Sequence, residues 1–281
     1  MIKADLHIHS TFSDGEYDVG QIIEMAQRKK LDVIAITDHD IIAPVASPAG
    51  GHYTQRGDCY RERACVPGIQ VIAGVEISSI HKDTNTKAHV LGYNVKKPEV
   101  INELTRPLLE ARSENSERQA GILVENGFRI DIGMLPRAGG KYLYKQHIVG
   151  WLAGTGQAPE MFGAFYRETF KNGGICDFDI EYIDVFTAVR TVKDAGGLAV
   201  LAHPGQQQNF RLIPQLVKIG LDGLELYRHS HTEKDRETIR GLAGRYGLFL
   251  TGGSDFHGKY SSSPYAIGDF LSDESGIRAL L

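Results

Sequence analysis

The first strand-like segment of the chain alternates between apolar and polar residues. The alternation runs from Ile2 to His9, which is the period of a strand with one buried face. Side chains two positions apart share a face of a strand, so Asp5, His7 and His9 point the same way. Two imidazoles about 7 Å apart along a strand can bind one metal ion. A turn then brings Asp14 beside them, so the segment predicts a metal site at the end of the first strand.

Short apolar runs and helical periods alternate along much of the remaining chain. The run at 31–37 is typical of a buried parallel strand. Apolar residues three and four positions apart, as at 16–30, indicate a helix. The pattern predicts further strands at 69–80, 88–93, 198–202, 221–227 and 248–252, and further helices at 98–126, 181–195, 212–219 and 232–246. This succession of strands and helices is typical of an α/β fold.

Two stretches interrupt this pattern. Residues 41–68 contain prolines, glycines and a run of mixed charges, and we expect a long loop there with one short helix at most. Residues 128–180 are mixed in character and rich in aromatic side chains. We therefore expect a main domain made of 1–97 and 181–281. A helical insertion at 98–180 is expected to serve as a substrate-recognition cap.

Residue types that bind metals gather at the ends of the predicted strands. An acidic residue such as Glu76, flanked by Val75 and Ile77, is costly to bury unless it is paired or metal-bound. The C-terminal ends of parallel strands meet at one edge of a βα barrel, where its active sites are built. Nine such residues are His7, His9, Asp14, His39, Glu76, His89, His203, Asp255 and His257. One histidine alone would also fit a polar strand end on the surface, but the whole set favours a metal centre.

Composition limits the classes of protein that remain. The 281 residues suit one large α/β domain or one domain with a sizeable insertion. A net charge of -4 gives no overall basic field for nucleic acid, so we expect no stable nucleic-acid partner. Three cysteines are too few and too scattered for a disulfide framework. No run of 18 apolar residues is present, so we expect a cytoplasmic enzyme with no membrane partner.

Six motifs, in order along the chain, resemble those of a known family. They are DLHIHSTFSDG, AITDHD, VIAGVEIS, AHVLGY, LAHP and GGSDFHG. Together they resemble the motif set of the PHP (polymerase and histidinol phosphatase) family, within the amidohydrolase superfamily. The resemblance implies an α/β fold, a distorted (βα)7 TIM-like barrel of the PHP type, here with a helical insertion. It also implies three divalent metal ions, with manganese as the first expectation and zinc or iron as alternatives.

The resemblance also implies how the metal ligands are shared. The first metal is expected on His7, His9, Glu76 and Asp255, the second on Glu76, His89 and His203, and the third on Asp14, His39 and His257. Clustered divalent ions lower the pKa of a bridging water, so the expected nucleophile is a metal-bridging hydroxide. Glu76 and Asp255 are then catalytic residues. Asp5 and Asp38 are candidates for orienting the imidazoles, with plain strand-end polar residues as the alternative.

Substrate recognition is expected from the insertion and from basic residues near the metals. Relatives in the nucleotide-hydrolysing branch commonly show Arg-Pro-His where this chain has Lys145, Gln146 and His147. Lysine is still a phosphate-binding cation but lacks the bidentate fork of arginine. We expect Lys145, His147 and Arg228 to bind substrate. His231 matches a family histidine and is expected to contact phosphate or to act catalytically by protonating the leaving group.

Three functional hypotheses follow. The first is a metal-dependent phosphomonoesterase acting on a small phosphorylated metabolite, such as a nucleoside 3′,5′-bisphosphate, a short oligonucleotide or histidinol phosphate. The second is a cyclic phosphodiesterase that opens a cyclic phosphate of a sugar and then releases phosphate. The third, from another class, is a non-catalytic PHP module. The presence of all nine ligand-type residues favours an enzyme, a hydrolase of phosphate esters.

Overall fold

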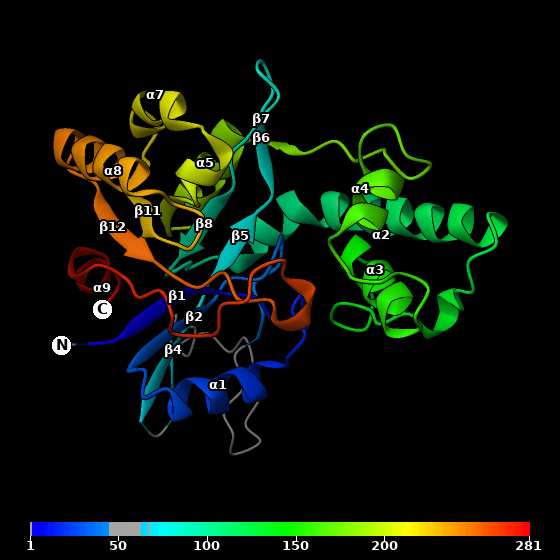
Figure 1. The fold of residues 1–281 in the computed structure, drawn as a ribbon. Coiled ribbons are helices and arrows are strands. Elements are labelled where there is room, and N and C mark those ends of the chain that lie inside the picture. Colours follow the sequence, from blue (N-terminus) through cyan, green and yellow to red (C-terminus); the bar gives the residue numbers. More distant parts are fainter. Residues whose placement is uncertain (1, 45–62, 67) are drawn as a thin grey trace.

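The computed structural model describes residues 2–44, 63–66 and 68–281 (Figure 1). Its strands are β1 (Ala4–Ile8), β2 (Val33–Ile36), β3 (Arg63–Val66), β4 (Ile69–Ala73), β5 (Val75–Ile77), β6 (Ser79–His81), β7 (Thr86–Lys87), β8 (Val90–Tyr93), β9 (Ile183–Asp184), β10 (Leu198–Leu201), β11 (Gly223–Tyr227) and β12 (Phe249–Gly252). Its α-helices are α1 (Val19–Arg28), α2 (Pro98–Glu125), α3 (Lys145–Gly154), α4 (Ala164–Phe170), α5 (Val185–Asp194), α6 (Pro204–Gln207), α7 (Ile213–Val217), α8 (Glu233–Tyr246) and α9 (Glu274–Leu280). Short 3-10 helices lie at Ile132–Met134, Phe210–Leu212 and Gly258–Tyr260.

The described strands form three sheets rather than one closed barrel. The strand orders are β1-β2-β4-β3, β12-β11-β10-β8-β5 and β7-β6-β9. Isolated parallel bridges, Ile8 with Phe256 and His39 with Glu76, link the first two sheets at their edges. The predicted α/β class is therefore confirmed as a mixed α/β fold. The finer expectation of a closed (βα)7 TIM-like barrel is not confirmed, because these edges are joined by single bridges rather than by continuous ladders.

The segment predicted as one strand at 69–80 changes sheet twice. Its first part, β4, pairs with β2 in the first sheet, whereas β5 pairs with β8 in the second and β6 with β7 in the third. The first change comes at Gly74, where an added Cβ would lie 2.9 Å from Thr37 and 3.0 Å from the carbonyl of Gly92. Glycine thus permits a crossing that a larger residue would obstruct. As a result, Glu76 lies at the seam between two sheets.

Strand β8 departs from the expected all-parallel arrangement. It pairs antiparallel with both β5 and β10. The chain returns from β5 to β8 through the β6–β7 hairpin, which reverses its direction, whereas a parallel return would need a crossover connection such as a helix. His89 therefore precedes its strand instead of following it. The antiparallel direction still places His89 at the same edge as the C-terminal ends of the parallel strands.

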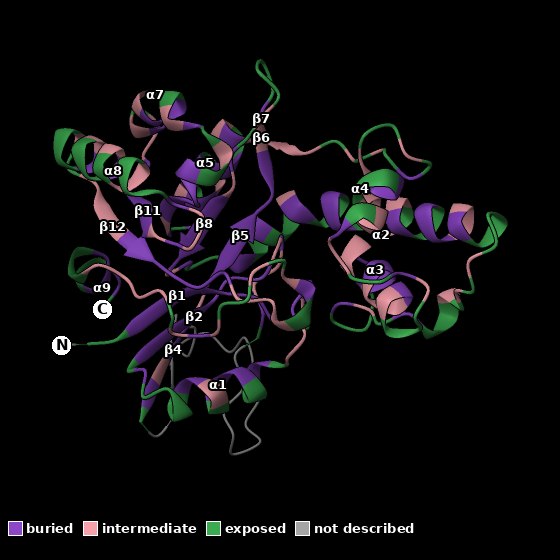
Figure 2. Cartoon of the chain, viewed as in Figure 1, coloured by how far each residue is buried: buried purple, intermediate pink, exposed green. Residues whose placement is uncertain are grey.

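Local sequence explains where the helices on the sheets begin. Asp18 caps α1 and forms a capping box with Gln21, and Thr232 does the same for α8 with Asp235. Figure 2 shows the strands buried and the outer faces of helices such as α8 exposed. The largest apolar cluster packs α5, α7 and α8 against β8, β10 and β11. This packing fixes the positions of the strands that carry the candidate ligands.

The predicted long helix at 98–126 is confirmed as α2, with α3 and α4 beside it. Figure 1 shows these three helices to one side of the sheets. They share a separate apolar cluster that includes Leu123, Ile148 and Phe170. Arg112 of α2 reaches across to Asp40 at 2.7 Å. The boundaries at 98 and 180, and the role as a substrate-recognition cap, stay predictions.

The predicted loop at 41–68 and the expected absence of a membrane span can be compared with the described residues. Most of the loop predicted at 41–68 lies outside the described residues, but its end forms β3, which the sequence pattern did not predict. In the described part of the chain, no helix combines the length and the apolar character that a membrane span requires.

Candidate metal centre

All nine predicted ligand residues meet at one edge of the sheets. Three groups have ligand atoms within 4.8 Å of one another: His7, His9, Glu76 and Asp255; His9, Asp14, His39 and His257; and His39, Glu76 and His89. The first group matches the predicted first metal site. The other two differ from prediction in detail, because His9 joins the third site and His39 replaces His203 in the second.

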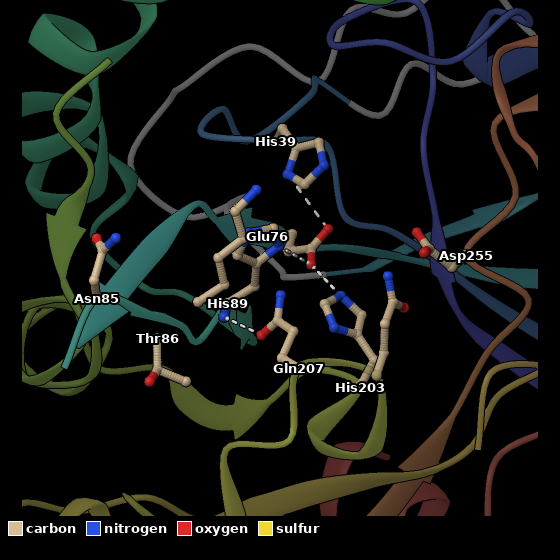
Figure 3. A pocket seen from close by; sticks show the side chains of 10 residues that line it. His39, Glu76, Asn85, Thr86, His89, His203, Gln207 and Asp255 are labelled. Atoms are coloured by element: carbon tan, nitrogen blue, oxygen red, sulfur yellow. Dashed lines mark hydrogen bonds and ion pairs between the residues drawn. The ribbon is translucent and has the colours of Figure 1, made fainter. Parts of the chain in front are cut away.

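Glu76 lies at the centre of this cluster. Its side chain is 1% exposed, and both of its oxygens face imidazoles. Oε2 lies 3.1 Å from His7, 3.2 Å from His9 and 3.4 Å from His39, and Oε1 lies 2.9 Å from His89 and 2.8 Å from His203. Figure 3 shows the carboxylate between His39, His89 and His203. A carboxylate in this position can bridge two metal ions, one on each oxygen.

The first group has the dimensions of a metal cage. The Nε2 atoms of His7 and His9 are 3.2 Å apart. From these two nitrogens, Glu76 Oε2 lies at 3.1 and 3.2 Å, and Asp255 Oδ1 at 3.3 and 3.1 Å. A tetrahedron with metal–ligand bonds of about 2.0–2.1 Å has edges of about 3.3 Å. Imidazole and carboxylate donors are also the types that suit zinc, manganese or iron, so this donor set fits a divalent ion.

The third group also fits an ion. Asp14 Oδ1 is buried without a hydrogen bond, although buried polar atoms are nearly always satisfied. The same oxygen lies 3.4 Å from His257 Nε2 and 3.8 Å from His9 Nδ1. The other oxygen, Oδ2, accepts a hydrogen bond of 2.7 Å from Gln146. Gln146 therefore orients this carboxylate so that its free oxygen faces the imidazoles.

Charge within the cluster is consistent with a cation site. Burial opposes the ionised forms of Glu76 and Asp255, but nearby imidazoles, together with Arg228 beside Asp255, hold the pKa of both carboxyls well below the usual range. Burial also opposes the charged form of His9, yet Asp255 and Glu76 outweigh it and raise its pKa to about 10. Burial prevails at His39 and lowers its pKa to about 4. Ionised carboxylates thus surround a space that attracts positive charge.

One expectation was that Asp5 and Asp38 orient the imidazoles. In the structure, neither carboxylate does so directly. Asp38 accepts hydrogen bonds from the backbone and hydroxyl of Ser10 and from the hydroxyl of Ser13, at 2.6–2.7 Å. Asp5 accepts from the backbone N–H groups of Ser254 and Gly268 at 2.9 and 2.8 Å. Burial raises the pKa of Asp5 to about 6. Both carboxylates hold the loops that carry the ligands.

The residues predicted to bind substrate differ in whether they line a hollow beside the candidate metal ligands. Lys145 lines a hollow beside the metal groups. His147 is buried, and its Nδ1 accepts from the backbone N–H of Tyr144 at 3.2 Å. The Arg228 guanidinium contacts Asp255 Oδ2 directly. Neither His147 nor Arg228 lines either of the two hollows described below, so their substrate contacts stay predictions.

His231 has no free ring nitrogen in this structure. Its Nδ1 lies 2.8 Å from the carbonyl of Leu226, and its Nε2 accepts from the N–H of Gly205 at 3.2 Å. The side chain is 4% exposed. This geometry argues against contact with phosphate or proton transfer to a leaving group. His231 instead ties the segment after β11 to the start of α6.

Sequence reasoning missed several residues that contact the candidate ligands, among them Glu225 and Gln146. Glu225 lies 2.9 Å from His7 Nδ1, and Gln146 contacts Asp14 as described above. A signal for Glu225 was available, since it is an acidic residue between Leu224 and Leu226, as Glu76 is between two apolar residues. Gln146 gave no such signal, because a polar residue at a helix start is common.

Two hollows open beside the cluster. The first, of about 510 Å³, is lined by His39, Glu76, Asn85, Thr86, Lys87, His89, His203, Gln206, Gln207 and Asp255. Figure 3 shows Asn85 and Thr86 on the side facing away from Asp255. The second, of about 230 Å³, includes Lys87, Arg112, Lys145, Lys171 and Asp179. His39, Lys87 and His89 line both, so the two hollows adjoin at these residues.

Comparison with known proteins identifies the family. A model of the PHP domain matches residues 5–175, which is more than half of the chain. The chain belongs to the PHP family. A phosphoribosyl 1,2-cyclic phosphate 1,2-diphosphodiesterase from Eggerthella lenta is 39% identical to this PHP protein, over 93% of this chain and 96% of the relative. A 3′,5′-nucleoside bisphosphate phosphatase from Chromobacterium violaceum is 28% identical, over 92% of this chain and 88% of the relative.

Solved structures agree with this assignment. A protein from Bifidobacterium adolescentis, assigned as a metal-dependent phosphoesterase, superposes on this PHP protein with a TM-score of 0.82. The two are 25% identical, and the match covers 100% of this chain and 96% of that one. The predicted family is thereby confirmed, and so is the predicted class of enzyme, a phosphoesterase hydrolase.

Proposed function

We propose that this PHP protein hydrolyses a phosphate ester of a small sugar or nucleotide that carries a second phosphate group. The observation that supports this proposal is the second hollow, which lies directly beside the candidate metal centre and is lined by Lys87, Lys145 and Lys171. We call this hollow the basic pocket. The metal centre would hold the phosphate that reacts, and the basic pocket would hold the phosphate that does not. Because both hollows share Lys87, a ribose-sized molecule is expected to span them.

The basic pocket contains more positively charged side chains than acidic ones, which favours an anionic ligand. Lys87, Lys145 and Lys171 line it, and its acidic lining residues are Asp14, one of the candidate metal ligands, and Asp179. Burial lowers the pKa of Lys87 and Lys145, and Asp179 opposes that shift in both. Arg112 also lines the pocket but pairs with Asp40 at 2.7 Å. A phosphate dianion would therefore meet more positive than negative charge there.

The chain's own residues would bind and orient the substrate. When divalent ions are bound, they supply Lewis-acid activation of water and of the phosphoryl oxygens. Glu76 and Asp255 would hold those ions as the predicted catalytic carboxylates. Manganese is the proposed metal, with zinc or iron as alternatives, and three ions are the proposed number, on ligand groups that share His9, His39 and Glu76. Asn85, Thr86 and Gln206 offer hydrogen-bonding groups for sugar hydroxyls in the larger hollow.

The first candidate substrate is a cyclic phosphate of a phosphorylated ribose. It is favoured by the 39% identity, over nearly the full length of both chains, to a relative named for such a substrate. The second candidate is a nucleoside 3′,5′-bisphosphate, the substrate first expected from sequence. It is favoured by Tyr166 and Tyr182, two aromatic residues that line the basic pocket and would offer apolar contact to a base. A non-catalytic module is disfavoured, since eight of the nine predicted ligand residues fall in the three groups and the ninth, His203, lies 2.8 Å from Glu76.

Product analysis separates the candidates. Apo protein reconstituted with Mn²⁺ would be incubated with phosphoribosyl 1,2-cyclic phosphate, nucleoside 3′,5′-bisphosphates, histidinol phosphate and short oligonucleotides. Phosphorus NMR would distinguish ring opening from release of inorganic phosphate. Turnover of the cyclic phosphate supports the first candidate, and turnover of bisphosphates alone supports the second. Turnover of histidinol phosphate alone, which has one phosphate, would contradict the two-phosphate proposal.

Lysine variants test the basic pocket. Lys87→Ala and Lys145→Ala are each expected to raise KM about tenfold or more, because a charged hydrogen bond contributes about 1.5–3 kcal/mol. Metal content should be unchanged. Lys82→Ala is the matched control, because Lys82 lies on the same hairpin as Lys87 but is exposed and pairs with Glu181 at 2.8 Å. An unchanged KM in both pocket variants would contradict the proposed phosphate site.

A further inference from the structure

Glu225 is a buried acidic residue for which the proposed chemistry gives no role. It lies in β11 between Leu224 and Leu226, and its side chain has no solvent exposure. It belongs to none of the three ligand groups. Burying a carboxylate is costly unless specific partners compensate. Its partners therefore indicate why it is there.

Both carboxylate oxygens of Glu225 contact candidate metal ligands. Oε1 lies 2.9 Å from Nδ1 of His7, on β1. Oε2 accepts a hydrogen bond of 2.8 Å from the backbone N–H of His203, which follows β10. One side chain thus connects two ligand residues that belong to different strands and different sheets.

The contact with His7 determines which ring nitrogen is available. Because Glu225 accepts from Nδ1, the Nδ1 atom carries the proton and the lone pair of the neutral ring lies on Nε2. Nε2 is the atom that faces Glu76 at 3.1 Å and Asp255 at 3.3 Å. Carboxylate groups that hold metal-ligating histidines in this way strengthen metal binding.

The contact with His203 supports an unusual backbone conformation. His203 has a φ of 31°, in the left-handed region that residues with a side chain rarely adopt. Pro204 begins α6 immediately afterwards. A hydrogen bond from the His203 N–H to a fixed carboxylate holds this conformation in place. In that conformation, the His203 ring points Nε2 toward Glu76 Oε1, at 2.8 Å.

We infer that Glu225 is a positioning residue of the metal centre, which fixes the ring of His7 and the backbone of His203 so that both imidazoles face Glu76. It does not ligate metal itself, because both of its oxygens are engaged on the side away from the cage. The inference rests on the candidate metal centre. It does not depend on the substrate, so failure of the substrate tests above leaves it standing.

Metal affinity of the variant Glu225→Gln tests the inference. The amide keeps the shape of the side chain but can accept only through its oxygen. Either His7 or the His203 N–H then faces an NH₂ group, and the Nε2 lone pair or the backbone conformation is lost. Affinity for Mn²⁺ and Zn²⁺, measured by competition with a chelating dye, is expected to fall about 10–100-fold. The visible absorption of the Co²⁺-loaded protein, which reports ligand geometry, is expected to change.

Asp222→Asn is the matched control. Asp222 directly precedes β11 and also accepts from a backbone N–H at β10, that of Ala199 at 2.8 Å, but it contacts no candidate ligand. Both variants are expected to lower the melting temperature of the apo protein, whereas only Glu225→Gln should weaken metal binding. Wild-type metal affinity and an unchanged Co²⁺ spectrum in Glu225→Gln would overturn the inference.

A second variant covers the case in which Glu225→Gln does not fold. Glu225→Asp retains the charge but has a shorter reach, so it cannot contact His7 and the His203 N–H at the same time. Its metal affinity is expected to fall several-fold, and its Co²⁺ spectrum to change. Wild-type affinity in Glu225→Asp would show that the two contacts do not set the geometry of the centre, which overturns the inference.

Discussion

Glu76 is the residue that connects the candidate metal groups. Two of the three groups include it, and its two oxygens face five imidazoles in total. Its position at the seam between two sheets means that no single strand controls the geometry around it. Any change in its charge should therefore affect more than one of the candidate ligand groups.

The variant Glu76→Gln tests this role. Removing the negative charge while keeping the shape should lower turnover by more than about 100-fold, beyond the usual cost of losing an outer-shell contact. The metal content of the purified protein, measured by mass spectrometry, should also fall. Glu237→Gln, an exposed change on α8, is the control. Full activity and full metal content in Glu76→Gln would contradict the bridging role.

Gly253 provides a second test, of backbone packing behind the centre. A Cβ at this position would lie 2.5 Å from both the Cβ and the backbone N of His7. Gly253→Ala should therefore displace β1, lower the free energy of unfolding by about 1–3 kcal/mol and weaken metal binding. Gly241→Ala, on α8 with nothing within 4 Å of the added Cβ, should be neutral or stabilising. Denaturant melts and metal titrations of both variants check the expectation.

Among single residues, the sequence motifs identified the candidate ligands but not the contacts that support them. His7, His9 and Glu76 could be found because imidazoles and carboxylates gathered at strand ends are typical of metal sites. The assignment of His231 was not supported because its backbone partners, Leu226 and Gly205, follow from tertiary packing. Glu225 carried the same buried-acid signal as Glu76.

Among the elements, helix α3 connects the insertion to the metal centre. Tyr144, its N-cap, donates from its hydroxyl to the carbonyl of His39 at 3.0 Å. Lys145 lines the basic pocket, and Gln146 donates to Asp14. Three consecutive residues thus contact a ligand backbone, the proposed phosphate pocket and a ligand side chain. Movement of this helix would alter substrate binding and metal binding together.

His147 on the same helix should make stability sensitive to acid. Burial lowers its pKa to about 4, below the ordinary value of 6.5. Between these two values the unfolded chain binds a proton that the folded protein does not, so the free energy of unfolding falls as pH falls from 6.5 to 4. At about 1.36 kcal/mol per pKa unit, the loss is about 3 kcal/mol.

Denaturant melts with a chelator present can isolate this contribution. His147→Gln cannot take up the proton, so its stability should fall less than that of the wild type between pH 7 and pH 4. The chelator keeps metal binding from contributing to the difference. If the two proteins lost the same stability over this range, His147 would not be the acid-sensitive group.

Periodicity predicted most elements, but not their sheet membership. The helices at 98–126, 181–195 and 232–246 correspond to α2, α5 and α8 within a few residues at each end. The run at 69–80 looked like one strand because an apolar period is unaffected when the chain crosses at Gly74 from one sheet to another. The direction of β8 could not be read from its own residues, since direction depends on the form of the preceding connection, here the β6–β7 hairpin.

In the whole molecule, the candidate centre lies between two sheets that also pack together through a buried apolar cluster, which includes Leu6 of the first sheet and Leu91 of the second. Its ligands come from the first sheet, the second sheet and the loops after β1, β2, β10 and β12. The two sheets meet at their edges through isolated bridges, at Ile8 with Phe256 and at His39 with Glu76. A bound ion would therefore strengthen the connection between the two sheets at both bridges.

Metal removal should lower the stability of the whole fold. A ligand at 100 times its dissociation constant raises the free energy of unfolding by about 2.7 kcal/mol. For a chain of this size, that corresponds to about 5–10 °C in melting temperature. Calorimetry of metal-loaded protein, before and after chelation, should show this drop, and Mn²⁺ should restore it. An equal response in Glu76→Gln would place the stabilising ion elsewhere.

The β6–β7 hairpin gives the enzyme a way to change specificity without rebuilding its centre. Glu76 lies before the hairpin and His89 after it, and the β5–β8 pairing fixes their spacing across the strands. The hairpin tip is exposed, and Asn85, Thr86 and Lys87 on its return limb line the hollow. Mutation, lengthening or exchange of this limb would therefore be tolerated in evolution while the ligands on either side remained in register. A laboratory library confined to the hairpin would be a short route to altered substrate choice.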